Sequence, residues 1–254
     1  MLRYKHLQPV RRKLLTCVIG AKGADGSTIV ADTRIMREYE ATNESKFHIL
    51  WDRVALAGAG TTALLDDFAS AIKDSKIPIA PSFGKTVQLI EDTMYALQER
   101  YRPRLGSEYD LETIVMGLEN FDKGDPYLRL VHGKGISEDI KDFAIIGHGA
   151  PYVATIFRLL YDPMLTAIEL GVLGYFSIQS IVQLGLDQTV GVGPLGPETV
   201  VLATNGEPRF LNPLEKEFSK ASESLRTLRF KLRLVDQVWT HVPQAYEAMV
   251  GKSA

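Results

Sequence analysis

Short runs of apolar residues at the start of the chain, interrupted by turn residues, predict β-strands joined by tight connections. The first run begins at Thr16 and the second ends at Ala31-Asp32, with Asp25-Gly26 as a strong signal for a hairpin turn between them. Because a hairpin folds its two ends together, Thr16 and Asp32 are expected to be neighbours. The four predicted strands of this part occupy residues 16–22, 26–31, 46–50 and 54–57.

The next segment changes to the helical period. Apolar residues recur so as to predict a helix from about Thr61, which Thr61 or Thr62 can cap. A second helix is predicted from about Ser82 to Tyr101, ended by Pro103. Two consecutive helices favour an antiparallel pair. The apolar positions of the first helix are Leu64, Leu65, Phe68, Ala71 and Ile72.

Strand signals return after this pair and are followed by helices again. Three strands are predicted in 111–119, 126–133 and 140–149 as a sequential antiparallel meander. Helices are then predicted at 151–161 and 177–186, strands at 198–203 and 208–212, and a largely helical tail from about 214 to 246. The segment LGVLGYF at 170–176 carries glycines that interrupt a clean helix, and either core packing or a subunit interface explains its apolar character.

This order of elements predicts the fold class. No alternation of strand and helix appears, so a doubly wound parallel sheet is not expected. Two stacked antiparallel sheets, each covered by a pair of helices, fit the order as an α+β, four-layer αββα sandwich. We expect one domain over 16–254 with a helical tail from about 214, preceded by a basic segment at 1–15.

Composition excludes several classes of function. The 254 residues carry a formal net charge of −2, so no broad positive field attracts nucleic acid or an acidic membrane surface. Cys17 is the single cysteine, and no Cys/His cluster has zinc spacing, so neither a structural metal nor a cofactor is expected. The first fifteen residues carry five Lys/Arg but no long apolar run, which favours a cytoplasmic protein. They are either a mobile arm or a removable segment ending at Leu15.

Three motifs together resemble the proteasome β-subunit family. They are TCVIGAKGADGSTIVADTR at 16–34, NESKFHI at 43–49 and LAGAGTTALLD at 56–66. The GAG-T portion favours β over α subunits. The family has the αββα fold of amino-terminal nucleophile hydrolases, so the resemblance implies the same architecture that the order of elements predicts.

The resemblance also implies roles for particular residues. Thr16 would be an amino-terminal nucleophile whose own α-amine acts as the base. Lys46 would lie beside the Thr16 hydroxyl and lower its pKa, with Asp32 balancing the lysine charge. Gly60 would donate its N–H to the oxyanion. On the substrate side, the resemblance points to three residues: Met36, Gly58 and Thr62.

Several positions depart from the family's pattern. Leu15 precedes the nucleophile where self-cleaving members usually have Gly, which bears on autolysis. His148 stands where a supporting serine normally contacts the threonine amine, and Asp187 matches the acidic residue behind it. Val190 replaces a second serine, and Met36 replaces a small polar residue.

The resemblance implies a threonine peptidase that hydrolyses peptides or unfolded protein through an acyl-enzyme, in a homo-oligomeric ring that an α-ring or ATPase could join. A related peptide ligase would use an amine in place of water at the last step. The departures at Leu15, His148 and Val190 leave a non-catalytic ring subunit or scaffold as an alternative. A third alternative is an amidase that uses Cys17 after cleavage one residue later.

Overall fold

The computed structural model describes most of the chain from Thr16 to Lys231. The described ranges are 16–37, 40–51, 53–60, 62–75, 83–105, 111–120, 123–187, 190–194, 196–204 and 206–231.

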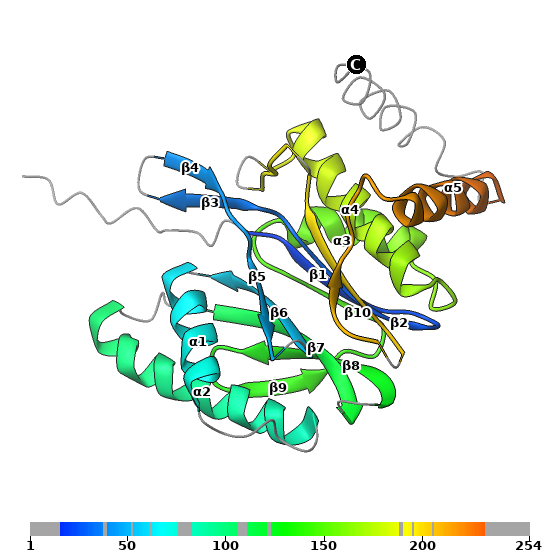
Figure 1. Ribbon diagram of the computed structural model, residues 1–254. Helices are drawn as coiled ribbons and strands as arrows, with labels where there is room; N and C mark the ends of the chain where they lie inside the picture. The colour runs from blue at the N-terminus through cyan, green and yellow to red at the C-terminus, as the bar shows by residue number, and fades with distance from the viewer. Residues whose placement is uncertain are drawn as a thin grey trace, which may run out of the picture.

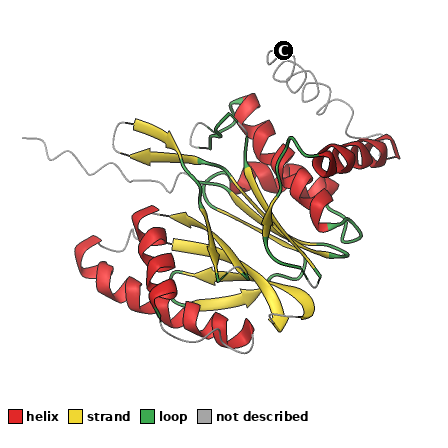
Figure 2. Ribbon diagram, viewed as in Figure 1, coloured by secondary structure: helices red, strands yellow, loops and turns green. Residues whose placement is uncertain are grey.

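Two five-stranded sheets form the centre of the molecule, and every pair of neighbouring strands is antiparallel (Figures 1 and 2). The first sheet has the order β10-β1-β2-β11-β12, with β1 Val18–Lys22, β2 Gly26–Ala31, β10 Phe143–Ile146, β11 Glu198–Ala203 and β12 Arg209–Phe210. The second has the order β5-β6-β7-β8-β9, with β5 Phe47–Leu50, β6 Val54–Gly60, β7 Leu111–Asn120, β8 Lys123–His132 and β9 Ile136–Asp139.

Helices cover the outer faces of both sheets. α1 (Thr62–Asp74) and α2 (Phe83–Leu105) bury an apolar cluster against the second sheet, which includes Phe68 and Met94. α3 (Ala150–Leu160) and α4 (Ala167–Leu184) do the same on the first sheet, and α5 (Lys216–Lys231) packs on α4 through Phe218. A third cluster fills the space between the sheets. The predicted four-layer αββα sandwich is confirmed.

Two glycines explain how α4 reaches the first sheet so closely. A Cβ at Gly171 would come within 2.8 Å of Thr199 Cγ2, and one at Gly174 would come within 2.7 Å of Val30 Cγ2. α4 starts at Ala167, ten residues before the predicted start near Ser177, so that prediction was wrong. The glycines of LGVLGYF lower helix propensity, but tertiary packing compensates for that loss.

α4 is long and apolar enough to cross a membrane by length and composition. Most of that helix is buried inside this fold, between the first sheet and α5. It is a core helix in this structure.

The predicted strand order needs two corrections. A separate hairpin, β3 (Arg34–Arg37) and β4 (Glu40–Asn43), lies between β2 and β5 and was not predicted. The prediction that the strand at 140–149 is the third strand of the meander after α2 was also wrong, because β9 (Ile136–Asp139), which was not predicted, takes that place beside β8. β10 crosses to the first sheet and pairs with β1.

Backbone hydrogen bonds show how the chain makes this crossing. The N–H of Ile140 still bonds to Leu128 of β8 in the second sheet, at 3.0 Å. Two residues later, the carbonyl of Asp142 accepts from the N–H of Lys22 in the first sheet, at 2.8 Å. The side chain of Ile140 is buried in the cluster between the sheets, which fixes the crossing point.

The helix boundaries differ from the predictions in smaller ways. Pro103 does not end α2, which continues to Leu105. Of the two capping candidates for α1, Thr61 lies outside the described residues and Thr62 is the first helical residue. The tail beyond Lys231 also lies outside the described residues.

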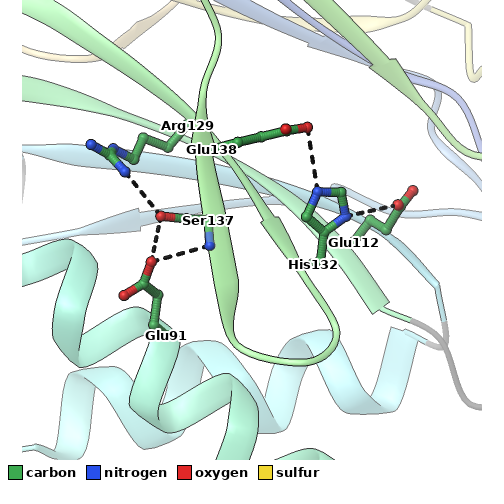
Figure 3. Close-up of polar contacts among 6 residues, drawn as sticks. All are labelled: Glu91, Glu112, Arg129, His132, Ser137 and Glu138. Carbon is green, nitrogen blue, oxygen red and sulfur yellow. Dashed lines mark hydrogen bonds and ion pairs between the residues drawn. The ribbon is translucent and has the colours of Figure 1, made fainter.

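Polar contacts at the β8–β9 hairpin attach the edge of the second sheet to α2 (Figure 3). Glu91 of α2 accepts from both the backbone N–H and the hydroxyl of Ser137, and Arg129 donates to that hydroxyl at 3.1 Å. On the neighbouring strands, His132 lies between Glu112 and Glu138, at 3.3 and 3.4 Å. These contacts hold β9, the edge strand of the second sheet, against α2 and β8.

Candidate active site

Thr16 lies two residues before the first residue of β1, with 4% of its surface exposed. Its carbonyl oxygen accepts a hydrogen bond from the N–H of Gly149, at 3.3 Å. Gly147 has φ +91°, and a Cβ there would come within 2.2 Å of the same oxygen. The turn after β10 therefore needs a glycine at 147 and encloses the backbone of Thr16.

Asp32 follows the end of β2, where the hairpin brings it beside the start of β1. Its N–H bonds to the carbonyl of Cys17 at 3.0 Å, and its Oδ1 accepts from the N–H of Cys17 at 2.8 Å. Its Oδ2 accepts from the N–H of Gly191 at 3.3 Å. The carboxylate is fully buried, so these donors replace water around it.

Lys46 immediately precedes β5 and joins the other two side chains. Its Nζ donates to Asp32 Oδ1 at 2.6 Å and to Thr16 Oγ1 at 3.0 Å. Lys46 is 4% exposed, so the ion pair is buried. The expectation that Thr16 and Asp32 are neighbours agrees with this geometry, and the structure brings all three side chains into contact.

Burial opposes both charges of this pair. It lowers the pKa of Lys46, and the negative charge of Asp32 counteracts part of that effect. It also raises the pKa of Asp32, although Lys46 and two backbone N–H groups favour the ionised form. An ammonium favours ionisation of a nearby hydroxyl only while it is charged, so Asp32, which opposes the effect of burial, helps Lys46 to act on Thr16.

Gly60 is the last residue of β6 and has φ +153°, a conformation that favours glycine. The hypothetical Cβ of Gly147 that nearly meets the Thr16 carbonyl also lies 3.3 Å from the Cβ of Ala59. The end of β6 therefore lies close to the backbone of Thr16, with Gly60 at its tip.

Of the three predicted substrate residues, the structure describes the surroundings of Gly58 only. A Cβ at Gly58 would come within 2.8 Å of Leu65 Cδ1, so its packing against α1 requires a small residue. Met36 lies in β3 and Thr62 begins α1, but their side chains lie outside the described residues. The structure therefore gives Gly58 a packing role.

His148 and Asp187 are brought together from distant parts of the sequence. His148 lies between Gly147 and Gly149, in the turn that encloses the Thr16 carbonyl. Its Nδ1 is 3.0 Å from Oδ2 of Asp187, whose side chain is 3% exposed. The imidazole is thus oriented by a buried carboxylate next to the segment that holds Thr16.

The loop after α4 contributes residues that the sequence analysis missed. Gly191 donates to Asp32, and its carbonyl accepts from the N–H groups of Thr33 and Arg34, at 3.1 and 3.0 Å. Gly193 donates to the hydroxyl of Thr33 at 2.8 Å. The glycines of GVG at 191–193 were the only sequence signal, and nothing in their spacing indicates a contact 159 positions away.

Cys17 lies next to Thr16 and its N–H donates to Asp32, but its thiol is not suited to act as a nucleophile. Burial raises the pKa of its thiol, and the negative charge of Asp32 adds to that effect. A thiol with a raised pKa is a poor nucleophile near neutral pH. Over the described ranges, no group of three or more His, Cys, Asp or Glu side chains has a geometry that could hold a metal ion.

The arrangement can perform acyl transfer. It joins a hydroxyl to an ammonium and a carboxylate, and β6 ends nearby in a glycine whose N–H can serve as an oxyanion donor. A nucleophile, a charge that lowers its pKa and a hydrogen-bond donor are the parts that such a reaction requires.

Comparisons with known proteins agree with this architecture. A family model described as "Proteasome subunit" matches residues 14–185. Among curated proteins, none matches the chain by sequence. Among solved structures, Anbu (ancestral beta-subunit) from Yersinia bercovieri matches with a TM-score of 0.68 and 12% identity over 85% of this chain and 96% of that one. Two Anbu structures from Hyphomicrobium sp. strain MC1, one a Gly-1 mutant, match with TM-scores of 0.65 and 0.62 at 17% identity, over 86% of this chain and 97% of each.

Proposed function

Because the chain belongs to the proteasome subunit family, we propose that it is an amino-terminal threonine peptidase whose nucleophile is Oγ1 of Thr16. The observation that carries the proposal is the contact of Lys46 Nζ with both Thr16 Oγ1 and Asp32 Oδ1. Burying an ion pair against a hydroxyl costs solvation free energy, and a catalytic role accounts for its presence.

The first step is removal of residues 1–15, which exposes the α-amine of Thr16. An unperturbed α-amine has a pKa near 8, which suits proton transfer around neutral pH. This amine takes the proton of Oγ1 as that oxygen attacks the substrate carbonyl. A carbon–oxygen bond forms, and the carbonyl π electrons move onto the carbonyl oxygen. The N–H of Gly60 stabilises that oxyanion, and a donor of this kind contributes about 3 to 4 kcal/mol.

The oxyanion then re-forms the carbonyl, and the carbon–nitrogen bond breaks. The protonated α-amine of Thr16 gives its proton to the leaving nitrogen. An ester between the acyl group and Thr16 remains. Water, which loses a proton to the same amine, hydrolyses the ester and restores the hydroxyl. Throughout these steps Lys46 stays charged, and its field favours the alkoxide form of Thr16.

His148 and Asp187 support the amine in this proposal. The imidazole, oriented by Asp187, takes the place of the serine that the family resemblance implies. It can accept a hydrogen bond from the amine and so direct the nitrogen lone pair toward Oγ1. In this proposal a peptide substrate binds as an extended strand between β3 and the end of β6 and presents its carbonyl to Thr16.

Intact mass combined with a peptide assay tests the proposal. We expect the active protein to begin at Thr16 and to cleave a fluorogenic peptide. Thr16→Ala should lower kcat by about a thousandfold or more, whereas Thr16→Ser should keep measurable turnover. Equal turnover by wild type and Thr16→Ala would refute the mechanism, and so would peptidase activity in a protein that retains residues 1–15. An inactive protein that retains these residues would favour the scaffold alternative.

We also propose that the chain forms a homo-oligomeric ring, as proteasome-like subunits do. Multi-angle light scattering at micromolar concentration should give a mass several times that of the chain that remains after residues 1–15 are removed. A monomer under these conditions would contradict the ring.

A further inference from the structure

A second carboxylate lies close to the Lys46–Asp32 pair. Glu198 is the first residue of β11 and pairs in register with Ala31, the residue before Asp32. It lies on the same face of β11 as Val200 and Leu202, whose side chains lie in the cluster between the two sheets. Its side chain is thus directed to the face of the first sheet that Lys46 approaches from the second sheet.

A ring contact supports this placement. Phe47, the residue after Lys46, packs against Phe210 of β12 with ring centroids 5.8 Å apart. Phe210 in turn is the cross-strand partner of Val200, two residues after Glu198. The start of β5 therefore lies against the β11–β12 pair.

The carboxylate of Glu198 is held less completely than that of Asp32. Its Oε2 is buried and has no hydrogen-bond partner among the described residues, whereas Asp32 accepts from three donors. A buried, unpartnered oxygen costs stability, and such a group calls for an explanation. Without a hydrogen bond, this oxygen can still interact electrostatically with the positive charge of Lys46.

We infer that Glu198 is a positioning residue that acts on Lys46 electrostatically, through the negative charge it places near the ammonium, and so keeps that ammonium charged beside Thr16 Oγ1. The charged and titratable groups that act on Lys46 are Asp32, Cys17 and Glu198. Burial lowers the pKa of Lys46, and all three oppose that effect, Asp32 most strongly. Of the three, Glu198 acts from the strand next to β2, so it adds negative charge from a second direction.

This inference rests on the proposed function only for its effect on turnover, so its test begins with a measurement that does not require catalysis. The ε-carbon signal of Lys46, in protein labelled with ¹³C-lysine and assigned by its absence in Lys46→Met, is followed with pH. In Glu198→Gln we expect its titration midpoint at lower pH than in wild type. Glu207→Gln removes the same charge from an exposed turn of the same hairpin and should leave the midpoint unchanged.

Peptidase activity provides the second measurement. Without Glu198 the lysine loses its proton earlier as pH rises, so the alkaline limb of kcat/KM should move to lower pH. We expect Glu198→Gln to have about fivefold lower kcat/KM than wild type at pH 9 and less than about twofold lower at pH 7.

Two results would overturn the inference. One is an identical Lys46 midpoint in wild type, Glu198→Gln and Glu207→Gln. The other is an equal loss of activity at every pH, which would make Glu198 merely structural. Failure of the proposed function gives a different result: Thr16→Ala then cleaves the peptide as well as wild type, whatever the lysine signal does.

Discussion

Asp32 and Glu169 each accept three hydrogen bonds, but their pKa values shift in opposite directions. Asp32 accepts from two backbone N–H groups and from Lys46, and burial raises its pKa. Glu169, in the first turn of α4, accepts from the N–H and hydroxyl of Thr166 and from Ser224 of α5. Partial burial raises its pKa, but these hydrogen bonds outweigh burial and the net shift is downward.

The difference shows that depth of burial, and not the number of hydrogen-bond donors, decides the direction in which the pKa of these two carboxylates shifts. Asp32 is fully buried, whereas Glu169 is partly buried and retains solvent on one side. Asp32 therefore depends on a cation, and removing that cation leaves an isolated buried charge. The Glu169 cluster fixes the start of a helix with neutral donors and can lose one of them at modest cost.

We expect the largest loss of stability from Lys46→Met, which tests most directly how the Asp32 carboxylate differs from the Glu169 carboxylate. Removing the cation leaves Asp32 buried with two N–H donors, so the free energy of unfolding should fall by about 3 to 5 kcal/mol. Urea unfolding followed by circular dichroism measures this. Lys134→Met, at an exposed turn, should change stability by less than about 0.5 kcal/mol.

A further variant identifies the cause of that loss. Adding Asp32→Asn to Lys46→Met removes the isolated charge and should restore part of the lost stability. A Lys46→Met protein within about 1 kcal/mol of wild type would show that Asp32 does not depend on the cation.

A smaller effect is expected at the other cluster. Thr166 is the N-cap of α4, its hydroxyl accepts from the N–H of Glu169, and Glu169 reaches back to the N–H of Thr166. Thr166→Ala should therefore lower the free energy of unfolding by about 1 kcal/mol. Thr155→Ala, on the exposed face of α3, is the matched control and should have little effect. A loss as large as that of Lys46→Met would contradict the comparison.

The smallest effect concerns pH. Because the pKa of Glu169 is lowered in the fold, its contribution to stability is present above the pKa of the unfolded chain and is lost as pH falls through the folded value. The stability difference between wild type and Glu169→Gln should therefore shrink from pH 7 toward pH 3. Urea unfolding at each pH measures it, with Glu207→Gln as the control. If the stability difference between wild type and Glu169→Gln grew as pH fell, the pKa of Glu169 would be raised by folding and not lowered.

Sequence patterns were sufficient for the parts of this fold that depend on local order. Asp25-Gly26 and the alternation on either side predicted the hairpin, and the hairpin alone places Thr16 near Asp32. Lys46 entered through the family resemblance, because no local rule indicates that a lysine of one sheet reaches a carboxylate of the other.

The features that were missed depend on tertiary packing. The start of α4 was missed because Gly171 and Gly174 weaken the helical signal, although Thr166 and Glu169 have the spacing of a capping box. The role of Gly191 could not be predicted, since it depends on how the chain returns to Asp32 after α4. The crossing of β10 was missed because its alternation is the same in either sheet.

The crossing of β10 also has a consequence for how the molecule folds. The turn that encloses the Thr16 carbonyl can form only after residues more than 130 positions apart have met, and Gly191 closes the same centre from still further along the chain. Contacts of such long sequence separation slow folding, because much of the chain must be ordered before they are made. The contacts among Thr16, Asp32 and Lys46 are thus expected to form late, when both sheets are already paired, so the chemistry proposed for Thr16 would wait until the surrounding chain has its final shape.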